Sequence, residues 1–98
     1  LGTATIQAAT IIENTARTGG GLLGGDAGTI TITNSLIRAN RALERGGGIH
    51  LWGATALTVS GSTVRLNRAD STGGGALSVT GTATALLTAT VVDSNQAN

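Results

Sequence analysis

A repeat of about 27 residues runs through the whole chain and limits the folds open to it more than any other feature. Glycine triplets recur three times at a constant 27-residue spacing. Asparagine recurs in step with them, at spacings of 26, 27 and 28 residues. The positions are Gly19, Gly20, Gly21, Gly46, Gly47, Gly48, Gly73, Gly74 and Gly75 for the triplets, and Asn14, Asn40, Asn67 and Asn95 for the asparagines. A phosphate-binding loop has no reason to occur three times in register, so the sequence predicts a repeat protein.

Apolar and polar residues alternate inside each repeat. The clearest run is TITIT at residues 29–33, and ALTVS (56–60) and TALLT (84–88) occupy the same place in the next repeats. Alternation of β-branched residues, bounded by glycine and asparagine, is typical of short strands. The residues of this strand expected to point inward are Ala4, Ile6, Ile30, Ile32, Leu57, Val59, Ala85 and Leu87.

Two further strands are expected in each repeat. One leads into the asparagine, with an aliphatic β-branched residue three positions before it, at Ile11, Ile37, Val64 and Val92. The other follows the glycine triplet, and its inward layers are predicted to be Leu22, Ile49 and Ala76, then Gly24, Leu51 and Val79. No stretch has sustained helical periodicity. We therefore expect about three short strands per repeat.

The all-β fold that stacks such units is a parallel β-helix, or β-solenoid, with one 27-residue repeat per coil. Neighbouring coils then lie about 4.8 Å apart, so residues 1–98 form a single segment of roughly three and a half coils, on the order of 15–20 Å tall. Repeat boundaries are expected near the four asparagines. Leucine-rich repeats are the alternative, since they share the period and an asparagine ladder. They need a leucine-spaced convex segment where this chain has glycine triplets, so we prefer the β-helix.

The asparagines and glycines are expected to build the corners of each coil. An inward asparagine can donate to, and accept from, the same asparagine one coil away, so a column of them satisfies itself. Asparagine also tolerates the left-handed backbone that a sharp corner needs. Alanine two positions later keeps the corner narrow, at Ala16, Ala42, Ala69 and Ala97. The glycine triplets supply positive φ angles at another bend.

The combination of aliphatic-x-x-Asn with Gly-Gly-Gly-aliphatic resembles the paired short motifs of polymorphic outer-membrane protein repeats. More broadly, it is similar to right-handed parallel β-helix repeats of secreted and surface proteins, over essentially all 98 residues. The family's usual Phe before x-x-Asn is Ile or Val here, and the middle or last glycine, often Ala or Ile in the family, differs as well. The resemblance implies a right-handed solenoid that is extracellular or at the cell surface, within adhesins and stalk-like passengers.

Composition argues against several classes of function. The chain has no cysteine, which excludes a disulfide framework and a thiolate metal site. Its net charge of +1 provides no attraction for nucleic acid, and no apolar run is long enough to span a membrane. No two carboxylates stand two apart on one strand, as paired-carboxylate catalysis would need; they are Glu13, Asp26, Glu44, Asp70 and Asp93. We therefore expect no catalytic residue, metal or cofactor, with a fragment of a polysaccharide-degrading β-helix enzyme as the less favoured alternative.

His50 and Trp52 stand two apart and are expected to project outward together, between the inward Ile49 and Leu51. Trp52 is the one aromatic residue of the chain. A solvent-facing tryptophan can stack on a glycan or anchor a partner, but it can equally cover backbone or contact a neighbouring copy. Its equivalents in the adjacent repeats are Gly25 and Thr80, so a site here would not repeat along the stack.

Threonines are expected to line the outward face of the TITIT strands. Thr29, Thr31, Thr33 and Thr58 are the central members of this array. Similar arrays occur on ice-binding β-solenoids, where regular spacing orders water. The plain alternative is that threonine is a favourable solvent-facing strand residue, and Gln7, Ala56 and Leu86 interrupt the array.

Arginines share equivalent positions beside the asparagines: Arg38 with Arg65, and Arg41 with Arg68. Stacked arginines repel one another unless carboxylates intervene, and Asp93, Glu44 or Asp70 can supply these. A solvated, weakly paired corner is the plain interpretation, and a site for an anionic polymer is the more specific one.

These features together predict a non-enzymatic, structural β-solenoid: a stalk, an adhesin passenger or an extracellular filament subunit. Open coil ends present unpaired backbone groups that favour strand addition. The expected partners are therefore neighbouring coils of a longer parent chain or identical copies stacked end to end, with a glycan or ice as further candidates.

Overall fold

The structure is a computed structural model that describes residues 2–25, 27–71 and 73–97 of the 98-residue chain. These residues contain fifteen strands and no helix. The strands are β1 (Gly2–Gln7), β2 (Thr10–Ile12), β3 (Thr15–Thr18), β4 (Leu22–Gly24), β5 (Ala27–Thr33), β6 (Leu36–Arg38), β7 (Arg41–Arg45), β8 (Ile49–Leu51), β9 (Ala54–Ser60), β10 (Thr63–Arg65), β11 (Arg68–Ala69), β12 (Leu77–Val79), β13 (Thr84–Thr88), β14 (Val91–Asp93) and β15 (Gln96–Ala97).

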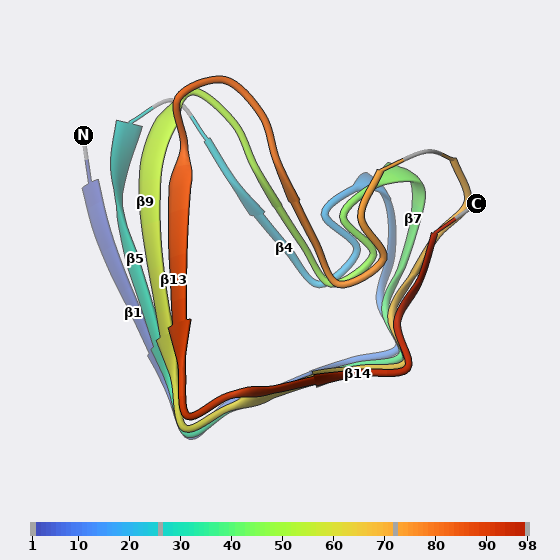
Figure 1. The fold of residues 1–98 in the computed structure, drawn as a ribbon, viewed down its shortest axis with the longest axis horizontal. Coiled ribbons are helices and arrows are strands. Elements are labelled where there is room, and N and C mark those ends of the chain that lie inside the picture. The colour runs from blue at the N-terminus through green and yellow to red at the C-terminus, as the bar shows by residue number, and fades with distance from the viewer. Residues whose placement is uncertain (1, 26, 72, 98) are drawn as a thin grey trace.

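The strands form four parallel sheets that run along the stack of coils. Sheet A has the order β1-β5-β9-β13, sheet B the order β2-β6-β10-β14, sheet C the order β3-β7-β11-β15 and sheet D the order β4-β8-β12. Viewed down the shortest axis of the molecule, the coils lie over one another (Figure 1). The extent along that axis is 18 Å. The predicted parallel β-solenoid with one repeat per coil is therefore confirmed.

Each complete coil has one strand more than the three expected. The additional strand lies in sheet C and begins directly after the asparagine, where the sequence suggested only a narrow corner. Arg68 pairs with Arg41 and Ala69 with Ala42, so the backbone of this segment continues the hydrogen-bonded ladder. Ala42 and Ala69 are buried and Arg41 and Arg68 are exposed. The segment therefore shows the alternation of inward and outward side chains that is typical of a strand.

The core is a set of aliphatic columns between the four sheets. One column pairs Ile6 with Ile32, Val59 and Leu87, as alternation predicts. Burial is complete in the two middle coils, and burying one such side chain contributes roughly 1.5–3 kcal/mol. The buried apolar residues are Ile30, Ile32, Ile37, Ala42, Ile49, Leu51, Leu57, Val59, Val64 and Ala69.

The third coil is one residue out of step with the predicted register in sheet D. Leu77, and not Ala76, pairs with Ile49, which in turn pairs with Leu22. The additional residue is accommodated between β11 and β12, since Arg68 pairs with Arg41 before it and Leu77 pairs with Ile49 after it. The predicted pairing of Gly24, Leu51 and Val79 is confirmed.

Candidate functional site

The four asparagines form one continuous column at the corner between sheets B and C. The Nδ2 groups of Asn14, Asn40 and Asn67 each donate to Oδ1 of the next asparagine, at 3.0, 2.9 and 2.9 Å. Their backbone N–H groups donate to the same oxygens at 3.0 or 3.1 Å. Asn40 Nδ2 also donates to the Ile11 carbonyl at 2.9 Å, and Asn67 and Asn95 make the equivalent bonds. The predicted asparagine ladder is confirmed.

The left-handed residue of this corner is not the asparagine itself. It is the preceding residue, with φ between 54° and 58°, at Glu13, Ala39, Leu66 and Ser94. A non-glycine residue in this region costs about 1–2 kcal/mol. The preceding residue makes the turn and leaves the asparagine amide aligned with the column. The expectation that asparagine takes the left-handed conformation is therefore wrong.

A second ladder, missed by the sequence analysis, lies at the corner between sheets A and B. Ser35 N–H donates to Ser62 Oγ at 3.0 Å, and Ala9 N–H donates to Ser35 Oγ at 3.1 Å. Ser62 Oγ donates to the Ser60 carbonyl at 2.9 Å. Ala9, Ser35, Ser62 and Thr90 each stand five positions before an asparagine. That regular offset was the available signal.

The glycine triplets form the bend between sheets C and D, where the chain turns inward (Figure 1). Gly19 and Gly46 have φ of 61° and 64°, as predicted. The second and third glycines are required for another reason, because a Cβ at Gly47 would lie 2.5 Å from the Arg68 backbone. A Cβ at Gly48 would lie 3.1 Å from Asn67 Nδ2.

The third triplet departs from the predicted equivalence. Gly47 N–H donates to the Gly74 carbonyl, and Ile49 N–H to the Ala76 carbonyl, so Gly74 occupies the place of Gly46. Gly73 lies opposite Arg45 instead, since a Cβ at Gly73 would lie 2.5 Å from Arg45 Cβ. The prediction that Gly73 is a corner glycine equivalent to Gly46 is wrong.

His50 is buried, with 6% of its surface exposed, which contradicts its predicted place on an exposed binding face. It does lie in the row of Leu23 and Ser78 on the outer side of sheet D. The glycine bend folds over it, since a Cβ at Gly46 would lie 2.8 Å from His50 Cβ. Its Nδ1 has no hydrogen-bond partner within the described ranges. Burial lowers the pKa of His50, and the positive charge of Arg45 acts in the same direction.

Trp52 is 45% exposed and follows β8 on the outer surface, as predicted. The backbone N–H of Trp52 donates to the Gly24 carbonyl, and the backbone N–H of Thr80 donates to the Leu51 carbonyl. These bonds place Gly25, Trp52 and Thr80 in one row. A Cβ at Gly25 would lie 1.9 Å from the indole atoms Cε2 and Nε1. The indole thus fills the space above Gly25.

The threonine face of sheet A has the predicted register. Thr29 pairs with Thr3 and Ala56, and Thr31 pairs with Thr5 and Thr58. Thr33 pairs with Gln7 and Ser60. Thr29 is exposed, whereas Thr31, Thr33 and Thr58 are half-buried by their neighbours. The regular face exists, with the interruptions that the sequence contains.

Charged groups on or beside sheets B and C form ion pairs, most of them between coils. Arg41 and Arg68 share Asp70, with Arg41 Nε at 2.9 Å from Oδ2 and Arg68 Nε at 2.9 Å from Oδ1. The hydrogen bond from Arg41 holds the pKa of Asp70 below its usual range, against the opposing effect of desolvation. Arg65 lies 3.7 Å from Asp93, as expected. Glu44 bonds instead to Arg17, at 2.6 Å.

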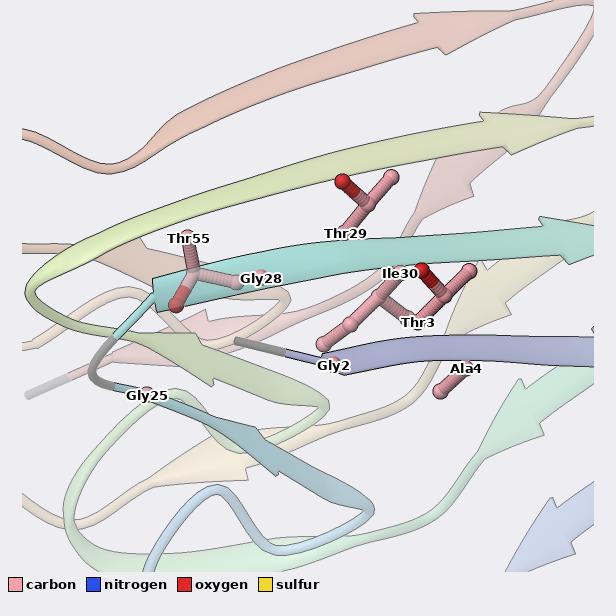
Figure 2. Close-up of a pocket in the computed structure, with 8 residues that line it drawn as sticks. All are labelled: Gly2, Thr3, Ala4, Gly25, Gly28, Thr29, Ile30 and Thr55. Carbon is pink, nitrogen blue, oxygen red and sulfur yellow. The ribbon is translucent and has the colours of Figure 1, made fainter.

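A hollow of about 320 Å³ opens beside Gly25, at the starts of β1 and β5 (Figure 2). It arises because Gly2, Gly25 and Gly28 line it, while the next coil has Thr55 opposite Gly28. None of its lining residues is titratable. Across residues 2–25, 27–71 and 73–97 no group of three or more His, Asp or Glu side chains is placed to hold a metal.

Comparison with protein-family models, curated proteins and solved structures finds no match to this chain. The described part of the chain has no helix of the length and apolarity that crossing a membrane requires. The parallel β-solenoid is thus shown by the structure, and the resemblance to polymorphic outer-membrane protein repeats stays a prediction.

Proposed function

We propose that this chain is a non-enzymatic, structural segment of a secreted or cell-surface β-solenoid that serves as a stalk, an adhesin passenger or an extracellular filament. The observation that carries the proposal is the direction of its polar side-chain bonds. The asparagine ladder, the serine ladder and the Arg17–Glu44 pair all join one coil to the next along the axis. Such bonds stabilise a rod and converge on no reaction site.

The partner that fits this arrangement is a further coil, from the same parent chain or from a second copy. Val92 continues the inward column of Ile37 and Val64, yet it is 51% exposed. The asparagine column also has a direction, since Asn14, Asn40 and Asn67 all donate toward the coil that follows. An asparagine placed beyond Asn95 would therefore accept from it, and a stacked coil would bury Val92.

Sedimentation velocity of the 98-residue chain over a wide concentration range tests axial association between copies. We expect reversible association that Val92→Lys abolishes, because a charge on the inward column opposes stacking. Leu86→Lys is the matched control, since Leu86 is 59% exposed but points outward from sheet A. A folded chain that stays monomeric at every concentration would contradict association between copies.

Two further measurements test the remaining parts of the proposal. Antibody labelling of intact cells should reach the chain if it belongs to a surface protein, and failure to label would contradict that location. A turnover screen on neutral and acidic polysaccharides should find no activity. Turnover that depends on Asp70 or Asp93 would replace the structural proposal by a catalytic one.

A second candidate function, ice binding, is favoured by the confirmed register of the threonine face. Threonine hydroxyl and methyl groups repeat there at the interstrand spacing of about 4.8 Å on three adjacent strands, in the row Thr5–Thr31–Thr58. We expect thermal hysteresis if this face orders water, and Thr31→Tyr should abolish it because the ring breaks the regular surface. Absence of hysteresis in the unmodified chain would remove this candidate.

A further inference from the structure

The indole of Trp52 packs over Gly25 of the preceding coil, in the space that a side chain at position 25 would otherwise fill. The indole lies where any side chain at position 25 would have to lie, at 1.9 Å from the Cβ that Gly25 lacks. Trp52 is nevertheless 45% exposed. The ring is thus supported on the Gly25 side and open to solvent elsewhere, which is an arrangement suited to a flat ligand.

Apolar and hydroxyl-bearing side chains lie in the described rows around Trp52. Leu23, two positions before Gly25 on the same face, is 52% exposed. Thr80 Oγ1 donates to the Leu51 carbonyl at 3.3 Å, and Thr82 Oγ1 to the Gly53 carbonyl at 3.1 Å. Each hydroxyl oxygen keeps lone pairs that can accept from a ligand. No charged side chain belongs to the two described rows that flank this surface, Leu23–His50–Ser78 and Gly25–Trp52–Thr80.

We propose that Trp52, with Leu23, Thr80 and Thr82, binds a neutral carbohydrate. The apolar C–H face of a sugar ring packs on the exposed indole, whose ring combines a large apolar surface with a polar N–H group. Sugar hydroxyls donate to the threonine oxygens. A charged polysaccharide gains nothing from the two flanking rows. The site is independent of the structural function proposed above, because it lies on the outer surface and not at a coil end.

Intrinsic fluorescence provides a direct measurement, because Trp52 is the sole tryptophan. The intact chain is titrated with cellohexaose and with the fully acetylated chitin hexamer as neutral probes, and with polygalacturonate as an acidic one. We expect a saturable change in tryptophan emission with at least one neutral probe and none with polygalacturonate. No saturable change with either neutral hexamer would overturn the proposal.

Calorimetry on variants separates stacking on Trp52 from general adhesion. Trp52→Ala should weaken binding roughly thirtyfold, a loss typical of an aromatic anchor, while Trp52→Phe keeps part of it. Gly25→Ala, which displaces the indole but retains it, should also weaken binding and shift the emission of the free protein. Leu86→Ala, an exposed apolar residue on sheet A, is the matched control and should bind like the unmodified chain.

The alternative roles of Trp52 have distinct outcomes in the same experiments. If Trp52 only covers the Gly25 backbone, Trp52→Ala lowers the melting temperature and leaves sugar binding unchanged. If it contacts a second copy, the variant changes sedimentation and not sugar binding. Either result would overturn the carbohydrate site, whereas loss of axial association in Val92→Lys has no bearing on it.

Discussion

The asparagine corner and the glycine bend both turn the chain once per coil, but they do so by opposite means. At the asparagine corner, side chains supply the hydrogen bonds, and the left-handed residue before each asparagine is never glycine. At the glycine bend, the turn exists because side chains are missing, since a Cβ at Gly47 would meet the Arg68 backbone. The first corner depends on side-chain amide hydrogen bonds, and the second depends on glycines whose missing side chains let two backbones approach closely.

The difference explains why one corner keeps its register and the other does not. The asparagine column requires each amide to meet the next, so its geometry is the same in every coil despite spacings of 26, 27 and 28 residues. The bend requires only that the backbone approach closely, and the third coil has one additional residue between β11 and β12. The two regions nevertheless touch, because Gly48 leaves space for Asn67 Nδ2.

The largest effect is expected from breaking the asparagine column at its centre. Asn67 is fully buried and makes bonds to Asn40, Asn95 and the Ile37 carbonyl. Asn67→Leu should lower the free energy of unfolding by about 3–5 kcal/mol, because each stranded buried group costs about 1–3 kcal/mol. Chemical denaturation measures this. Asn14→Leu, at an exposed position of the same column, is the control, and equal losses in both variants would contradict a ladder that stabilises the interior.

The glycine bend is tested by adding one methyl group. Gly47→Ala should cost about 2–3 kcal/mol, since the contact is with backbone that cannot rotate away. Gly61→Ala is the matched control: Gly61 has a φ of 57°, but its equivalents include Ala8 and Ala89, which adopt the same conformation. We expect a loss below about 1 kcal/mol there. Thermal and denaturant unfolding of both variants would show whether close approach, and not φ, governs the bend.

The serine ladder should rank below both corners. Ser62→Ala removes the acceptor of the Ser35 N–H group, which is buried, and the donor to the Ser60 carbonyl. We expect a loss of about 1–2 kcal/mol in denaturant unfolding. Ser71→Ala, at an exposed serine outside the corners, should be neutral. A neutral Ser62→Ala would mean that the backbone alone defines this corner.

The smallest effect concerns His50, which the glycine bend buries. Its folded pKa lies below the unfolded value of about 6.5, because of burial and Arg45. The unfolded chain therefore binds a proton more readily than the folded chain. Stability should be full above about pH 6.5 and decline as the pH falls through the folded pKa. Melting temperatures of the unmodified chain and His50→Gln between neutral and mildly acidic pH should converge as the pH falls; parallel curves would contradict this.

Much of the fold and part of the candidate site follow from reading the repeat. Alternation identified the inward columns through Ile32 and Val59, and recurrence identified the asparagine ladder. Trp52 was correctly placed on the surface opposite Gly25 and Thr80. The burial of His50 was not predictable in this way, because alternation reports which side of a strand a residue faces and not whether another segment covers that side. The strand after each asparagine was missed because it has only two to five residues and carries a single small apolar residue, such as Ala42 or Ala69, at its inward position.

The sequence by itself determined the period, the inward faces and the ladder positions of this protein. It could do so because stacked parallel coils place equivalent residues over one another, so chemistry that works in one coil must recur in the next. Only the tertiary structure decided where the chain folds back on itself. Three findings depend on it: Gly74, and not Gly73, takes the place of Gly46, the glycine bend buries His50, and the Trp52 indole packs over Gly25. Each depends on the space that an adjacent backbone leaves, and the residues of one strand do not reveal that space.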